Sequence, residues 1–238
     1  MSRPMGAALL AAAALAAAPA GAQVGYEPPE SPFRDLEYKQ EVTAFAGYLR
    51  TAGDVAGVAP RGGPAVGVRY ELRLGGPVQL MVRAMRASSE RQLVDASAPA
   101  ESRVLGLRSQ GLYVADLGIT LNLTGQKSWR GLVPVVNGGL GLAADFQGDA
   151  DPQTDTTRTG YKFGTPFAFS FGTGVRWTPG GRFQLRADLT DYLYQVKYPD
   201  TFFVAPAGGT ALLGPDVKQN QWKNNLAFTL GASVLFFR

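Results

Sequence analysis

The sequence predicts an all-β protein: an eight-stranded antiparallel up-and-down transmembrane β-barrel. Three observations favour this fold. From Leu226 to Phe236 every second residue is apolar and those between are mainly small or polar, which is the period of a strand with two different faces. Seven more segments share this period, and short and long connections alternate between them. No segment after residue 22 has 18 consecutive apolar residues, so no spanning helix is predicted.

The first 22 residues have the composition of a secretory signal peptide. Arg3 supplies a positive charge, an alanine-rich apolar run follows, and Ala20-Gly21-Ala22 is a cleavage site of the A-x-A type. The run is too short and too rich in alanine for a spanning helix, and a buried N-terminal helix is the less favoured alternative. We therefore expect export and a mature chain that begins at Gln23.

Residues 23–40 are polar and contain several prolines, which predicts a periplasmic tether rather than a strand. Ser31 and Pro32 are suited to begin one short helical turn that ends at Leu36. Residues 41–238 then form the barrel.

Eight segments with a period of two fill the barrel region. They are Glu41–Thr51, Pro64–Leu74, Val78–Ser88, Gln110–Leu123, Leu132–Phe146, Phe163–Trp177, Phe183–Lys197 and Lys223–Phe237. The connections after the second, fourth and sixth segments are short. The others are long, and Ser89–Ser109 and Tyr198–Trp222 are the longest. This alternation indicates short periplasmic turns and long extracellular loops.

Each segment has one apolar face, which two architectures would explain. A soluble lipocalin-like barrel points this face inward around a ligand, whereas a membrane barrel points it outward to lipid. The lysines favour the membrane barrel because all six lie in the tether, turns, loops or strand ends: Lys39, Lys127, Lys162, Lys197, Lys218 and Lys223.

Large aromatic residues near the strand ends predict two interfacial girdles. The expected upper girdle contains Tyr48, Phe146, Phe163, Tyr192, Tyr194 and Trp222. The expected lower girdle contains Trp129, Trp177, Phe183 and Phe236.

Charged residues recur on the polar face, which we expect to line the lumen. Eight strands enclose a space that side chains just fill, and an unpaired buried ion costs several kcal/mol, so these charges should pair. The expected lumen charge network contains Arg69, Glu71, Arg73, Arg83, Asp116, Arg176, Arg186 and Asp188, with Asp145 on the same face. It has two interpretations: a structural network that fills the barrel, or a gated path for water, ions or small or apolar solutes.

Several motifs resemble the small outer-membrane β-barrel superfamily of OmpA/OmpX type. They are EVTAFAGYLR (Glu41–Arg50), VNGGLGLA (Val136–Ala143), FGTGVRW (Phe171–Trp177) and LRADLTDYLY (Leu185–Tyr194). In the last segment, the family's assembly signal is matched by Thr229, Gly231, Val234 and Phe236. Family members usually end on Phe, whereas here Phe237 is followed by Arg238.

The resemblance implies a protein of the cell outer membrane. Its partners would be outer-membrane lipid, lipopolysaccharide, the barrel-assembly machinery and an extracellular protein or surface bound through the loops. The chain has no histidine or cysteine, which excludes Ser-His-Asp and Cys-His catalysis, disulfides and thiolate metal sites. The known outer-membrane barrel enzymes each rely on a histidine, so the resemblance implies a protein that is not an enzyme.

The leading functional hypothesis is a structural or interaction scaffold that presents extracellular loops. The alternatives are a narrow channel and the soluble ligand-binding barrel. We expect no catalytic, cofactor or metal site, and the dispersed basic residues indicate no nucleic-acid partner.

Two of the long loops have an unusual composition. An acidic loop contains Asp145, Asp149, Asp151 and Asp155, but the spacing does not match an EF-hand, so we expect a solvated loop rather than a calcium site. The loop Thr201–Gly214 is unusually apolar. It either packs on itself over the barrel mouth or binds lipopolysaccharide or a partner.

Overall fold

The computed structural model describes residues 31–146, 160–206 and 209–236. The predicted signal peptide, most of the tether, the acidic residues Asp149, Asp151 and Asp155, and the last two residues lie outside this range. Within the described part of the chain, no helix is both long enough and apolar enough to span a membrane.

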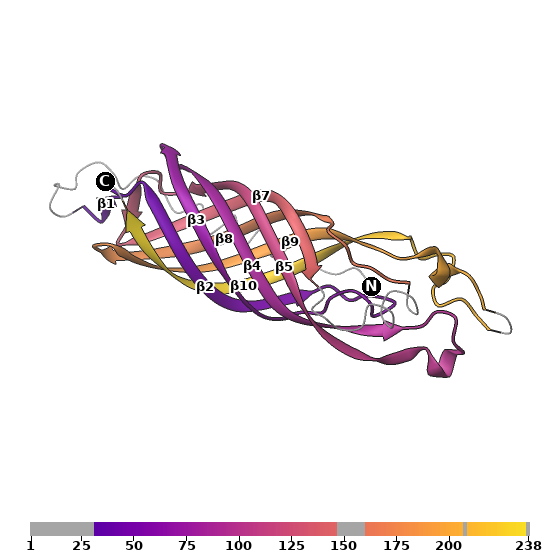
Figure 1. Ribbon diagram of the computed structural model, residues 1–238. Helices are drawn as coiled ribbons and strands as arrows, with labels where there is room; N and C mark the ends of the chain where they lie inside the picture. The colour runs from indigo at the N-terminus through magenta and orange to yellow at the C-terminus, as the bar shows by residue number, and fades with distance from the viewer. Residues whose placement is uncertain (1–30, 147–159, 207–208, 237–238) are drawn as a thin grey trace, which may run out of the picture.

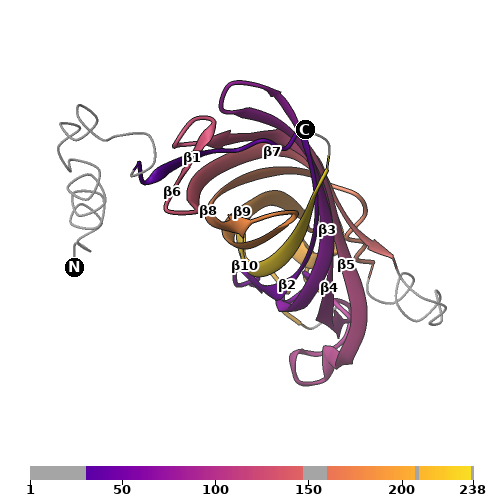
Figure 2. The same ribbon diagram turned by 90° about the vertical axis from the view of Figure 1, so that its left-hand side faces the viewer.

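Eight long strands form a closed antiparallel barrel (Figure 1). They are β2 (Gln40–Thr51), β3 (Gly63–Gly75), β4 (Val78–Val94), β5 (Val104–Asn122), β7 (Leu132–Phe146), β8 (Phe167–Gly180), β9 (Phe183–Lys197) and β10 (Asn220–Phe236). Each pairs with the next, and β10 closes the ring by pairing with β2. Figure 2 shows this ring from the end that carries the short strand β1 (Phe33–Asp35). The predicted fold is therefore confirmed.

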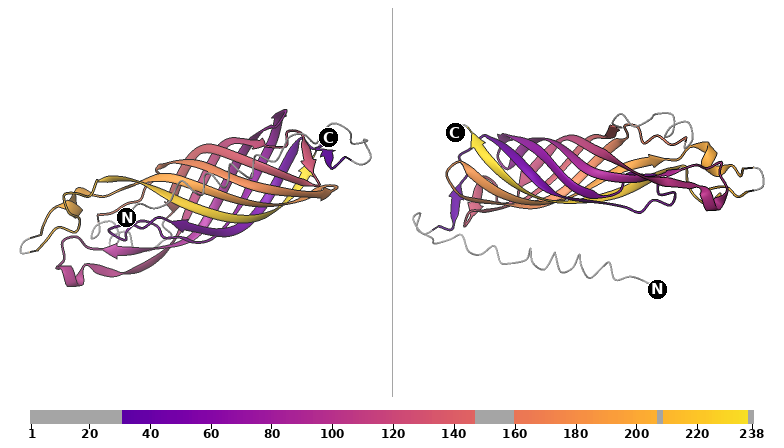
Figure 3. Two further views of the ribbon diagram at one scale, coloured as in Figure 1. Left: turned by 180° about the vertical axis from the view of Figure 1, so that it is seen from behind. Right: turned by 60° about the horizontal axis from the view of Figure 1, so that its bottom comes forward.

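The β4–β5 hairpin is longer than the sequence predicted. The sequence predicted an unpaired connection over Ser89–Ser109. In the structure, pairing between the two strands continues from Glu90 and Ser109 up to Val94 and Val104. The hairpin and the β9–β10 connection extend far beyond the barrel, as Figure 3 shows from two further directions. These extensions contain short 3-10 turns at Ala100–Ser102 and Asp200–Phe203.

Strand β8 begins four residues later than predicted. Gly164 has a φ of +73°, a left-handed conformation that interrupts an extended strand, and the strand starts only at Phe167. Phe163 consequently belongs to the preceding loop, and its side chain is buried.

The predicted helical turn at Ser31–Leu36 is wrong. Residues 33–35 instead form β1, which pairs with β6 (Lys127–Trp129) inside the β5–β7 connection. The Leu36 amide donates to the Gln126 carbonyl oxygen (2.9 Å), so the backbone of this segment bonds to a distant turn rather than to itself.

The outer surface of the barrel is apolar and its interior is polar. Along β8 the exposed side chains run from Phe167 to Trp177, ten residues apart. At about 3.3 Å per residue and a tilt of about 40°, they span about 25 Å, the height of the apolar band of an outer-membrane barrel. This orientation does not fit the soluble ligand-binding alternative, which needs the apolar face inside.

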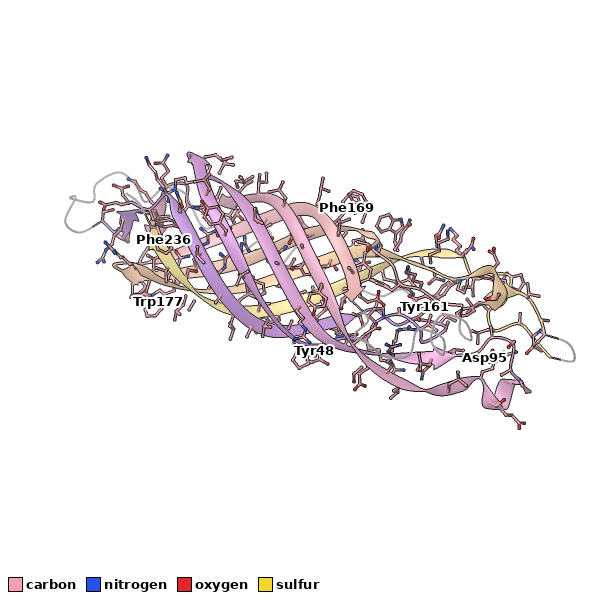
Figure 4. All side chains as sticks on the ribbon, viewed as in Figure 1. Tyr48, Asp95, Tyr161, Phe169, Trp177 and Phe236 are labelled. Carbon is pink, nitrogen blue, oxygen red and sulfur yellow. The ribbon has the colours of Figure 1, made fainter. Side chains whose placement is uncertain are left out.

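The aromatic girdles differ in part from the prediction. Figure 4 shows Trp177 and Phe236 on the outside near one end of the barrel, and Tyr48 and Phe169 on the outside toward the other. The expected members Tyr192 and Tyr194 are instead buried. They are separated from inward-facing Asp188 by an even number of residues along β9. Alternation along the strand therefore points them inward, although large aromatic residues were expected to face the membrane. Phe163 is also buried, and the Phe146 side chain is outside the described part.

Candidate functional site

Glu71, near the lower end of β3, is the centre of the buried charges. Arg69 Nη2 lies 2.6 Å from its Oε1. Arg176 Nη2 and Arg186 Nη1 lie 2.7 and 2.8 Å from its Oε2. The Glu71 side chain is 1% exposed, so one carboxylate holds guanidinium groups from three strands out of contact with solvent.

A second carboxylate, which the sequence reasoning missed, lies directly opposite. Glu41 pairs with Glu71 in the β2–β3 register and is completely buried. Its Oε1 lies 3.1 Å from Arg186 Nη1 and accepts hydrogen bonds from Gln184 (2.9 Å) and Ser233 (2.7 Å). Its inward parity on β2 was the signal that could have identified it, but Glu41 was treated only as the start of a strand.

Two bidentate pairs extend the network toward the extracellular side. Arg186 donates to both oxygens of Asp188 at 2.7 and 3.0 Å. Arg83 donates to both oxygens of Asp116 at 3.0 and 2.7 Å, and Ser170 Oγ donates to Asp116 Oδ2 at 2.5 Å. Two parallel hydrogen bonds fix the orientation of a guanidinium as well as neutralising it.

The charges in this region balance. We define the buried ion cluster as four arginines and four carboxylates: Arg69, Arg83, Arg176, Arg186, Glu41, Glu71, Asp116 and Asp188. Its net charge is zero. The cavity beside Arg69, Arg83 and Asp188 measures about 10 Å³, which is about the space that one water molecule requires. The side chains therefore fill the lumen at this level.

Arg73 and Asp145 were expected in the same network, but the structure places them elsewhere. Arg73 lies two residues before the β3–β4 turn, below the cluster, where its Nη1 donates to the Leu36 carbonyl oxygen at 2.5 Å and its guanidinium stacks on Tyr38 at 4.8 Å. Asp145 lies at the opposite, extracellular end of β7.

A segment from before the barrel closes its periplasmic mouth. Leu36 and Tyr38 are 6% and 7% exposed and pack against Val133, Val135 and Leu235. We call Leu36 and Tyr38 the basal plug. An open pocket of about 640 Å³ remains beside it at the mouth.

The extracellular half of the lumen contains a large apolar cluster, beside which one arginine, Arg91, is also completely buried over the Tyr161 ring. Inward-facing residues of the strands, among them Leu49, Tyr192 and Tyr194, form one cluster with residues of the loops. The loop members include Val58, Tyr161, Phe163, Tyr198, Phe202 and Leu213. We call the four loop segments that share this core, including the tip of the protruding β4–β5 hairpin, the extracellular cap. Tyr161, labelled in Figure 4, belongs to this core and is buried.

Aromatic stacking and hydrogen bonds hold the cap together. Phe202 is completely buried and stacks on Tyr198 (6.3 Å) and Tyr161 (6.5 Å). Tyr198 Oη donates to Asp54 of the first loop, and Arg103 of the hairpin donates to the Thr210 carbonyl oxygen of the last. Burial also raises the pKa of Tyr161. These contacts favour self-packing for the loop Thr201–Gly214.

The four residues of the predicted assembly signal lie on β10. Thr229 and Gly231 face the interior, and a Cβ on Gly231 would lie 2.8 Å from Thr43 Cγ2. Val234 and Phe236 face outward. All four lie on the edge that closes the barrel against β2.

Among the described residues, no group of three or more acidic side chains is placed to hold a metal ion. The polar interior and the apolar outer belt define a closed transmembrane β-barrel whose lumen is filled by side chains.

The chain is similar to solved structures of bacterial surface and outer-membrane proteins. The crystal structure of Neisserial surface protein A matches 83% of this chain and 97% of its own, with a TM-score of 0.51 and 14% sequence identity. The outer membrane protein OprG from Pseudomonas aeruginosa matches 85% of this chain and 98% of its own, with a TM-score of 0.49 and 9% identity. No protein-family model and no curated protein sequence matches the chain.

Proposed function

We propose that this protein is a closed, non-enzymatic barrel of the cell outer membrane that acts as a scaffold, with the extracellular cap as its interaction surface. Filling of the lumen at three successive levels carries the proposal. The basal plug occupies the periplasmic end, the buried ion cluster the middle and the apolar core of the cap the extracellular end. An ion would have to displace all three to pass.

The cap supports the interaction role. Its loops share a buried core, so they present one shaped surface rather than separate mobile chains. Exposed residues on that surface include Val55, Leu107 and Val204. We propose that the surface of the cap binds an extracellular protein or another surface.

Biogenesis follows from the same proposal. We infer that residues 1–22 act as a cleaved signal peptide and that residues 23–40 are a periplasmic tether, whose last part is held on the barrel by β1 and the basal plug. The barrel-assembly machinery would recognise Thr229, Gly231, Val234 and Phe236 on β10. The outward aromatic and apolar belt supports a membrane location for the barrel.

Conductance of a planar lipid bilayer tests closure. Refolded protein should insert, as judged by a heat-dependent shift in gel mobility and by protection of the strands from protease, yet give no discrete current steps. Arg69→Gln and Arg186→Gln variants serve as the comparison. Stable current steps in the unmodified protein whose size changes in these variants would contradict the scaffold and support a narrow channel.

A further inference from the structure

A groove lies on the outer surface of the barrel at the extracellular end of β3. Its volume is about 630 Å³, and its lining includes Tyr48, Arg61, Arg86, Ser88, Glu90 and Tyr113. It forms because β3 begins at Gly63, whereas its neighbour β4 and the next strand β5 continue upward past that point.

The groove adjoins the lipid-facing belt. Arg86 lies directly opposite Tyr113 on the outward face of the β4–β5 pair, and Pro64 lies opposite Tyr48 on the β2–β3 pair. On the same face below it, the exposed side chains are apolar and include Val68, Val82 and Leu117. The groove therefore lies where the apolar belt gives way to polar residues, the level of lipid headgroups.

Both arginines of the groove are exposed but fixed at their bases. The Arg61 amide donates to the Glu90 carbonyl oxygen (2.8 Å) and Ser89 Oγ donates to the Arg61 carbonyl oxygen (2.7 Å). The Arg86 guanidinium lies 5.8 Å from the centre of the Tyr113 ring. Gly111 gives it room, because a Cβ there would lie 3.3 Å from Arg86 Nε.

The groove is cationic. Arg61 and Arg86 outnumber Glu90, the one acidic residue of its lining.

We propose that this groove binds the phosphate group of a glycolipid in the outer leaflet. Guanidinium groups form paired hydrogen bonds with phosphate, the tyrosines suit the headgroup level, and the valines below offer a surface for acyl chains. The inference rests on the proposed outer-membrane location, but it does not depend on whether the lumen conducts.

Native mass spectrometry of the protein in nonionic detergent, titrated with diphosphoryl lipid A, tests the site. The double variant Arg61→Gln/Arg86→Gln should bind about tenfold more weakly, because it loses two solvent-exposed charge contacts. Glu90→Gln should bind more tightly. Arg182→Gln, which removes an exposed cation at the periplasmic end, is the matched control and should bind as the unmodified protein does.

Two further probes identify the source of the phosphate. Dephosphorylated lipid A should bind as weakly as diphosphoryl lipid A binds to the double variant. Glucosamine 6-phosphate should fail to compete at equal concentration; full competition would assign the groove to a soluble phosphate and overturn the lipid proposal. Equal lipid binding by the double and unmodified proteins would also overturn it.

Folding must be established for each variant. Each should keep the heat-dependent mobility shift, and Arg61→Lys/Arg86→Lys preserves the charges if the glutamine variant does not fold. A protein that binds lipid A in this way yet conducts ions would contradict the closed scaffold alone. A closed barrel whose lipid binding does not depend on the phosphate groups would contradict only the proposed phosphate site in the groove.

Discussion

At the scale of single residues, Glu71 has the greatest effect on the barrel interior. It is the carboxylate that three arginines share, and none of them reaches solvent. A buried ion that loses its partner keeps its full desolvation cost.

Glu71→Gln should therefore lower the free energy of unfolding by about 3 to 5 kcal/mol, because it leaves an excess of buried positive charge. Urea unfolding in lipid vesicles, followed by the mobility shift, measures this. Glu90→Gln, an exposed change of the same kind, should have little effect. Adding Arg176→Met to Glu71→Gln should restore part of the stability; no recovery would contradict the ion-pairing account.

Glycine also matters at this scale where two strands approach closely. A Cβ on Gly47 would lie 1.9 Å from the Phe228 carbonyl oxygen, across the β2–β10 seam. Gly47→Val should therefore block closure and abolish the heat-dependent mobility shift. Ala46→Val, one residue away and outward-facing, should fold normally. A normal shift in the Gly47 variant would show that the seam has more room than this distance allows.

At the scale of elements, the strand ladder follows from the sequence but the segments that fill the barrel ends do not. Period two located all eight long strands. It did not predict that Leu36 and Tyr38 turn into the barrel, because that contact depends on a β1–β6 pairing between segments about ninety residues apart. The long β4–β5 hairpin was missed because its upper half has polar residues on both faces.

The basal plug predicts restricted access from the periplasmic side. Because the chain has no cysteine, Val135→Cys introduces a single inward-facing thiol, which the basal plug covers. A small maleimide should label this thiol slowly in the otherwise unmodified protein and much faster when Leu36 and Tyr38 are both changed to Ser. Equal labelling rates would show that these side chains do not close the mouth.

The cap predicts an effect confined to the loops. Phe202→Ala should cost about 3 to 5 kcal/mol of local stability, since a buried aromatic ring is removed. Protease should then cut the extracellular loops sooner, while the barrel keeps its mobility shift. Val204→Ala, at a position 64% exposed, is the control. Loss of the barrel itself would mean that cap and barrel unfold as one unit.

At the scale of the whole molecule, the sequence predicted the fold and most of the lumen charges, but not how they are grouped. Parity along each strand identified the inward arginines and carboxylates. The pairing of Glu41 with Arg186 joins the second strand to the ninth, and no local pattern reports such a contact. The apolar core of the cap was missed for the same reason, since it combines residues from all four loops.

The shared core of the cap also sets an order of events in time. Its members include Leu49 on β2 and Ala227 on β10, so the core is complete only after the first and last barrel strands have met. Until then each loop lacks part of the surface on which it packs. The extracellular cap is therefore the last region to fold. During refolding, resistance of the loops to protease should arise after the mobility shift, never before it.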